Sequence, residues 1–172
     1  GLGIASIEKD KERYEHKYEY CDLLVTGSGP AGLSSAYSAA KNGAKVILAE
    51  DKPRFGGSLL TDDVTIDNLS GKAWADKIIT ELKEMPNVIV KNRSQVFGYY
   101  DHNMMVMFER TGDHLNNKPK YTPRQKLWYI RAKEVLLSTG SIERPIVFGN
   151  NDTPGVFLSA AAKEYIKVYG VL

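Results

Sequence analysis

The chain has 172 residues, 42% of them hydrophobic, which is enough to bury the core of one domain. Its 23 basic and 21 acidic residues nearly cancel, and no apolar run approaches the roughly 20 residues of a membrane span, so neither nucleic acid nor a membrane is an expected partner. The single cysteine, Cys21, permits no internal disulfide, which favours a reducing, cytoplasmic setting.

Residues 1–20 carry dense alternating charges with interleaved tyrosines, and we expect a solvated N-terminal arm there. Residues 21–172 are then expected to form one domain. Because the sequence does not begin with Met and stops at Leu172 just after a helical pattern, we expect a fragment of a longer chain whose C-terminal part is absent.

The first part of that domain predicts a strand, a helix and a second strand. The apolar run Asp22–Thr26 is typical of a buried strand, and the alanine-rich stretch Ala31–Asn42 of a helix that packs closely on a sheet. Gly43 is suited to end that helix, and Lys45–Ala49 is the second buried strand. So short a succession predicts a right-handed βαβ unit with parallel strands.

Residues 51–67 are expected to be a loop, and the apolar spacing of Ala73–Met85 predicts an amphipathic helix that ends before a proline. The remaining elements are strand-like runs before, within and after a meander, and a last helix. They are Val88–Val90, then Gln95–Tyr100, Met104–Glu109 and Lys126–Ile130 as the meander, then the buried strand Glu134–Ser138 and the helix Ser159–Val168. The fold class predicted is α/β, a Rossmann-like FAD/NAD(P)-binding domain with a parallel sheet, an antiparallel β-meander insertion and flanking helices.

The turn between the first strand and the first helix is rich in glycine. It reads Gly27-Ser28-Gly29-Pro30-Ala31-Gly32, and we call it the glycine loop. Gly27 allows a sharp turn, Gly29 allows the backbone to approach a diphosphate, and Gly32 allows helix and strand to pack closely. The helix N-terminus then offers unpaired N–H groups and a partial positive charge to the phosphates. A tight turn without a ligand is the alternative.

An acidic residue follows the second strand at the spacing such a loop requires. Glu50 lies 18 residues beyond Gly32, where a carboxylate meets the adenosine ribose hydroxyls and disfavours the 2′-phosphate of NADP. Asp51 could take this role by one residue of slippage, and a plain surface charge is the other alternative.

Two further segments favour a flavoprotein-type fold. Gly57 and Ser58 lie in a paired-glycine loop that admits a ligand or a second backbone closely. Thr139 and Gly140 follow a buried strand and resemble the second glycine signature of two-dinucleotide flavoproteins. Val96, on the first meander strand, is a candidate for backbone contacts to the adenine, with a plain core role as its alternative.

No catalytic residue and no metal site is predicted. One cysteine cannot serve as the redox pair of a disulfide reductase. His16, His102 and His114 are scattered without partners at metal-ligand spacing.

The chain resembles the dinucleotide-binding part of the alpha subunit of heterotetrameric sarcosine oxidase over nearly its whole length. The most specific segment is Phe97–Asn103, which reads FGYYDHN. Besides the glycine loop, the resemblance is carried by residues 13–16, 55–60, 138–145 and 150–156.

This resemblance implies an enzyme that demethylates sarcosine oxidatively to glycine, transfers the one-carbon unit to tetrahydrofolate and forms hydrogen peroxide. It implies NAD in this domain, FAD and FMN in the partner subunit, and beta, gamma and delta subunits as partners, with sarcosine and tetrahydrofolate bound elsewhere. The fragment alone is expected to be inactive. The cofactor roles implied fall on Gly27, Gly29, Gly32, Glu50, Gly57, Ser58, Val96, Thr139 and Gly140.

Two other functions stay open at the level of sequence. One is an FAD-binding subunit of a related heteromeric amine or amino-acid dehydrogenase, because FAD and NAD share the ADP half that the motifs recognise. The other is a non-catalytic assembly module.

Overall fold

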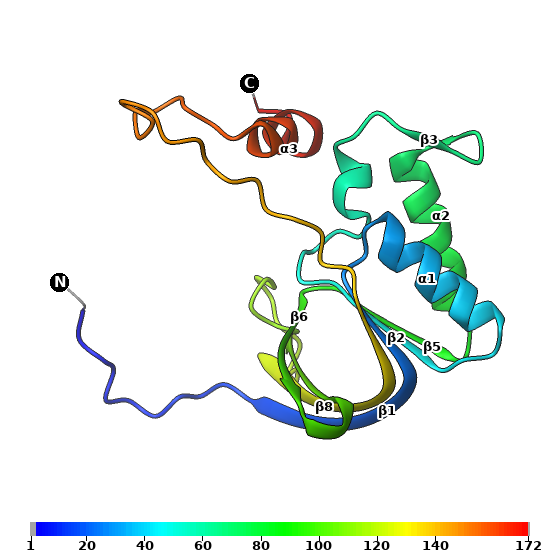
Figure 1. Cartoon of the computed structure of the whole chain (residues 1–172). Coiled ribbons are helices and arrows are strands. Elements are labelled where there is room, and N and C mark those ends of the chain that lie inside the picture. The colour runs from blue at the N-terminus through cyan, green and yellow to red at the C-terminus, as the bar shows by residue number, and fades with distance from the viewer. Residues whose placement is uncertain (1–2, 172) are drawn as a thin grey trace.

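The computed structural model describes residues 3–171, and its centre is a six-stranded sheet with the order β5-β2-β1-β8-β7-β6 (Figure 1). The strands β5, β2, β1 and β8 run parallel, while β7 and β6 are antiparallel. The bounds are β1 (Tyr14–Thr26), β2 (Val46–Ala49), β5 (Val88–Lys91), β6 (Ser94–Tyr100), β7 (Met104–Arg110) and β8 (Gln125–Leu137). The predicted α/β class, with a parallel sheet and an antiparallel meander, is confirmed.

Two helices, α1 (Pro30–Lys41) and α2 (Gly71–Glu84), cover one face of the parallel strands (Figure 1). Their apolar sides bury a core with the inward residues of β1 and β2, and the small residues Ala36 and Ala40 let α1 lie close to the sheet. α2 begins at Ser70, whose Oγ accepts a hydrogen bond from the Ala73 N–H at 3.3 Å. The sheet and these two helices form the framework that holds the turn after β1.

The meander strands curl the sheet so that its far edge returns to the end of β2 (Figure 1). The Ser94 N–H at the start of β6 donates to the Glu50 carbonyl at 2.7 Å. The curl encloses a second core, in which the buried Trp128 donates through Nε1 to Glu109 Oε2 at 2.7 Å. Lys91 Nζ lies 3.0 Å from the other oxygen of Glu109, so this buried carboxylate has two partners.

Two predicted strands, Lys126–Ile130 and Glu134–Ser138, are a single strand in the structure. β8 continues through Arg131 and Lys133, and it pairs with β1 from Gln125 to Leu137. Exposed charged residues interrupt the apolar pattern there, although the backbone stays in the ladder. The prediction of two separate strands was therefore wrong.

The strand β1 also begins earlier than predicted, at Tyr14 rather than Asp22. The charges of this stretch pair across the sheet, with Glu15 near Lys126 at 3.2 Å and Glu19 near Lys45 at 2.8 Å. The Tyr18 ring stacks on Tyr129 with ring centroids 5.0 Å apart. The solvated arm expected over residues 1–20 therefore ends before Tyr14.

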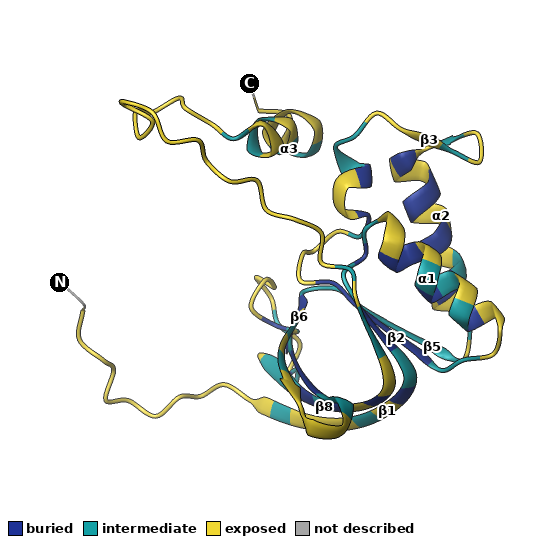
Figure 2. Cartoon of the chain, in the orientation of Figure 1, coloured by how far each residue is buried: buried dark blue, intermediate teal, exposed yellow. Residues whose placement is uncertain are grey.

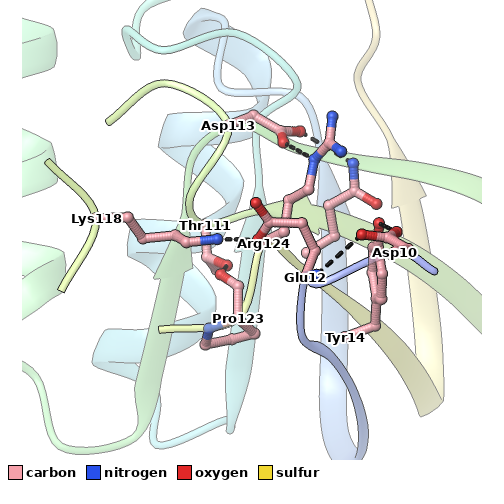
Figure 3. A network of polar contacts seen from close by, with 9 residues as sticks. Asp10, Glu12, Tyr14, Thr111, Asp113, Lys118, Pro123 and Arg124 are labelled. Atoms are coloured by element: carbon pink, nitrogen blue, oxygen red, sulfur yellow. Dashed lines mark hydrogen bonds and ion pairs between the residues drawn. The ribbon is translucent and has the colours of Figure 1, made fainter. Parts of the chain in front are cut away.

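Polar contacts connect the segment before β1 to the loop between β7 and β8 (Figure 3). Glu12 pairs with Lys118, and the Arg124 N–H donates to the Arg13 carbonyl at 2.7 Å. Arg124 Nε lies 2.5 Å from Asp113 Oδ1. These groups lie at the surface, where each ion pair contributes about 1 kcal/mol or less.

The loop predicted over residues 51–67 holds short elements: η1 (Gly57–Leu60), β3 (Thr65–Ile66) and, just beyond, β4 (Leu69–Ser70). The last helix, α3 (Ser159–Tyr169), begins where the sequence predicted. Residues 139–157, which precede it, are almost entirely exposed (Figure 2). Ion pairs connect α3 to the loop after η1, from Lys163 to Asp62 at 3.1 Å and from Lys167 to Asp63 at 2.8 Å.

The single cysteine should be unreactive while the chain is folded. Cys21 is fully buried in β1, and burial raises the pKa of its thiol to about 12. Because only the thiolate attacks disulfide reagents, we expect no release of thionitrobenzoate from Ellman's reagent at pH 8. One equivalent should be released in urea. Rapid reaction of the folded chain would contradict the buried position of this thiol.

Candidate functional site

The glycine loop lies at the carboxyl ends of β1, β2 and β8, where ligands of open α/β sheets bind. The Gly27 N–H donates to the Ala49 carbonyl at 2.8 Å, and the Ser138 N–H donates to the Thr26 carbonyl at 2.8 Å. The Ser138 hydroxyl donates to Thr26 O at 2.8 Å and lies 3.0 Å from Gly27 O. Both neighbouring strands therefore fix the start of the loop.

Two glycines of the loop leave no room for a side chain. Gly27 has a φ of +99°, and a Cβ there would lie 2.3 Å from the Ser138 carbonyl oxygen. A Cβ on Gly32 would lie 2.0 Å from Gly27 O and 2.7 Å from Ser138 Oγ. These contacts agree with the sharp turn and the close helix–strand packing inferred from the sequence.

The third glycine, Gly29, faces open space at the start of α1. Apart from its two chain neighbours, a Cβ added there meets no heavy atom of residues 3–171 within 4 Å. Gly29 is the N-cap of α1, and no side chain in the described part of the chain caps this helix. Pro30 and Ala31 are exposed, so the free N–H groups and the positive end of α1 point at an accessible position. A diphosphate fits this arrangement.

A second backbone lies against the glycine loop. Gly57, with a φ of +53°, would place a Cβ 2.9 Å from Gly29 Cα, and the Gly56 N–H donates to Ser28 O at 3.1 Å. The paired glycines thus allow close approach of two chain segments. Ser58 follows on η1 with its side chain exposed beside this contact.

The carboxylate of Glu50 points toward the glycine loop, and the residue as a whole is 6% exposed. Its Oε2 accepts from the Ser28 N–H at 2.9 Å and from the Ser28 hydroxyl at 2.5 Å, and its Oε1 accepts from the Lys52 N–H at 3.0 Å. A carboxylate has about four acceptor positions, and the Ser28 and Lys52 donors fill three of them. Burial and a hydrogen bond with Asp51 raise the pKa of Glu50, while the Ser28 and Lys52 donors lower it.

The other predicted residues lie around this centre at different distances. Thr139 Cα is 3.3 Å from the position of a Gly27 Cβ, and Gly140 follows with a φ of +71°. Asp51 is exposed, and its carbonyl accepts from Arg110. Val96 lies farther along the edge strand β6, half-buried beside an irregularity in the ladder.

Two hydroxyl groups whose contacts the sequence does not predict hold the site together. Ser28 contacts the acid at the end of β2, and Ser138 contacts the turn after β1. Their small size fits the motif, but their partners lie 22 and 111 residues away, so no local pattern indicates them.

Over residues 3–171, no three His, Cys, Asp or Glu side chains are grouped so that they could hold a metal ion. Within the same range, no helix is long and apolar enough to cross a membrane.

A glycine loop after the first strand, an open helix N-terminus and a buried acid after the second strand define a Rossmann-like FAD/NAD(P)-binding domain. Residues 22–110 match the model of the FAD dependent oxidoreductase family. The chain belongs to that family.

The chain is also similar to curated proteins whose names agree with the resemblance noted from its motifs. It is 45% identical over 171 residues to the alpha subunit of sarcosine oxidase from Rhizobium meliloti, covering 99% of this chain and 17% of that protein. It is 38% identical to the corresponding protein of Corynebacterium sp. strain U-96, covering 99% of this chain and 18% of that protein. The resemblance to this alpha subunit is confirmed, and the chain spans less than a fifth of these relatives' length.

Solved structures share the fold. L-proline dehydrogenase from P. horikoshii superposes with a TM-score of 0.71 at 26% identity, covering 96% of this chain and 31% of that one. Thioredoxin reductase of T. acidophilum superposes with a TM-score of 0.53 at 17% identity, and the match covers 77% of this chain and 40% of that one. This likeness shows a shared fold alone.

Proposed function

We propose that the chain binds the ADP half of NAD, with the diphosphate at the N-terminus of α1 and the adenosine ribose at Glu50. The observation that carries this proposal is the start of α1, which has no side-chain cap and is open at Gly29, beside the buried carboxylate of Glu50. Thr139, Gly140, Gly57 and Ser58 would border the diphosphate, and Val96 would contact the adenine through its backbone. The proposed cofactor-binding residues also include Pro30, Ala31 and Asp51.

The role of this chain is to bind and orient the dinucleotide. A bound nicotinamide or flavin supplies the capacity to accept a hydride. The Ser28 and Lys52 donors keep Glu50 directed at the site, and Gly27 and Gly32 keep α1 close to the sheet. No side chain of this chain is assigned a catalytic role.

The whole protein is proposed to be a subunit of a sarcosine oxidase. The similarity to the alpha subunits of sarcosine oxidases across 99% of this chain supports that assignment. The reaction would be oxidative demethylation of sarcosine to glycine, with transfer of the one-carbon unit to tetrahydrofolate and formation of hydrogen peroxide. The partners would be beta, gamma and delta subunits with FAD and FMN, in the cytoplasm.

FAD is a second candidate for the bound dinucleotide. The family match to FAD dependent oxidoreductases favours it. The FAD-binding subunit of a related amine or amino-acid dehydrogenase is then the alternative function, and 27% identity to an opine oxidase subunit of Agrobacterium tumefaciens supports it.

Calorimetric titration of the 172-residue chain with ADP-ribose, NAD and FAD tests the proposal and separates the two candidates. We expect all three to bind through their common ADP half, with NAD tighter than FAD if the first candidate is correct. A yellow chain that releases FAD on denaturation would favour the second. A folded chain that gives no heat with any of the three ligands would overturn the site.

A further inference from the structure

The hydroxyl of Ser28 lies between two loops that border the site. Ser28 is fully buried, its Oγ lies 2.5 Å from Glu50 Oε2, and the Gly56 N–H approaches the same Oγ at 3.2 Å. The Gly56 N–H also lies 3.1 Å from Ser28 O, so it is shared between two oxygens of one residue. A single side chain therefore connects the glycine loop, the acid after β2 and the paired-glycine loop.

The chemistry of these partners fixes the direction of each hydrogen bond. A backbone N–H can only donate, so Ser28 Oγ accepts from Gly56. An ionised carboxylate can only accept, so the one hydroxyl proton of Ser28 points at Glu50. Together with the Ser28 N–H, this hydroxyl gives Oε2 two donors from one residue. These bonds leave no freedom for the carboxylate to rotate without losing a partner.

We infer that Ser28 is a positioning residue that orients Glu50 and thereby sets the preference of the site for a ribose 2′-hydroxyl. This inference rests on the proposed dinucleotide site. Oε2 accepts two hydrogen bonds from Ser28, so a ribose hydroxyl would donate to Oε1, which also accepts from the Lys52 N–H. Without the Ser28 hydroxyl, the carboxylate can turn, and Oε1 no longer faces one direction.

The test compares ADP with 2′-deoxy-ADP. The two differ by the hydroxyl from which Glu50 is proposed to accept a hydrogen bond. We expect the unmodified chain to bind ADP about tenfold more tightly, the typical effect of one hydrogen bond to a charged group. In Ser28→Ala the ratio of the two dissociation constants should approach one. Ser28→Thr keeps the hydroxyl and should keep most of the preference. If the alanine variant fails to fold, Ser28→Cys replaces it, because cysteine is close in size to serine and only a weak donor. The ratio of the two dissociation constants should then approach one in Ser28→Cys.

A merely structural role for Ser28 would weaken both nucleotides equally and leave their ratio unchanged, and this result would overturn the inference. A second readout is the double variant Ser28→Ala with Glu50→Gln. Because Ser28 acts through Glu50, the double variant should discriminate between ADP and 2′-deoxy-ADP no less than Glu50→Gln alone does. If the unmodified chain bound neither nucleotide, the proposed function itself would fail. If it bound both nucleotides equally, the proposed site would be supported, but the proposed role of Ser28 would be excluded.

Discussion

Replacing Gly29 with glutamate should reduce dinucleotide binding at least a hundredfold while the chain stays folded. The Cβ of the new side chain would have no heavy atom of the described residues within 4 Å apart from its chain neighbours, so it meets no steric barrier. Its carboxylate would lie at the start of α1, where the diphosphate is proposed to bind. Two unit charges about 4 Å apart near a protein surface repel by about 4 kcal/mol, which exceeds the cost of a hundredfold loss. Calorimetry with ADP-ribose measures the loss, and circular dichroism checks the fold.

Two alanine variants are the matched controls for this result. Gly29→Ala adds only a methyl group in open space, so stability should be unchanged and binding only partly reduced. Gly32→Ala places the same methyl group 2.0 Å from Gly27 O, and such overpacking costs about 1–3 kcal/mol, measurable by urea unfolding. Undiminished ADP-ribose binding by Gly29→Glu would contradict the diphosphate position. If the variant lost only its assembly with partner chains, the chain would be an assembly module.

The affinity for ADP-ribose should fall on acidification, with a midpoint above the ordinary pKa of a glutamate. Burial and the hydrogen bond with Asp51 raise the pKa of Glu50, and only the ionised form attracts the ribose hydroxyl as a charged acceptor. The folded chain takes up this proton more readily than the unfolded chain. The contribution of Glu50 to the free energy of unfolding therefore decreases as pH rises from the ordinary pKa to the raised one.

Calorimetric titrations from mildly acidic to neutral pH check this expectation, with Glu50→Gln as the reference. The glutamine variant should bind about 10- to 100-fold more weakly at neutral pH and lose the acidic dependence. Asp51→Asn tests whether the neighbouring carboxyl group is responsible instead. The backbone carbonyl of Asp51 accepts from Arg110, and this variant should keep most of the affinity. The same pH profile in Glu50→Gln and the unmodified chain would rule out Glu50 as the titrating group.

The sequence predicted the βαβ unit well because its signals are local. Buried parallel strands are apolar on both faces, and the turn needs glycine where Gly27 and Gly32 meet backbone. The parts predicted poorly depend on distant partners. β8 continues through Arg131 because β1 and β7 pair with it there, and β1 begins at Tyr14 because β8 lies beside it.

The candidate site follows the same division. The motif alone predicted that Glu50 and the glycine loop come together, and the structure places them in hydrogen-bond contact. The hydroxyls of Ser28 and Ser138 could not be predicted, since a small residue satisfies the motif whether or not it donates a hydrogen bond. The binding roles of Val96, Thr139 and Gly140 stay predictions.

The contact between Gly27 and Ser138 joins residues 111 positions apart, and this separation determines when the site can form. During synthesis, the turn after β1 leaves the ribosome long before its second support has been made. Pairings between residues so distant in sequence form late, because a long loop must close first. The newly made turn should therefore stay unable to bind a nucleotide until β8 joins the sheet, so that completion of the sheet and competence for the cofactor coincide.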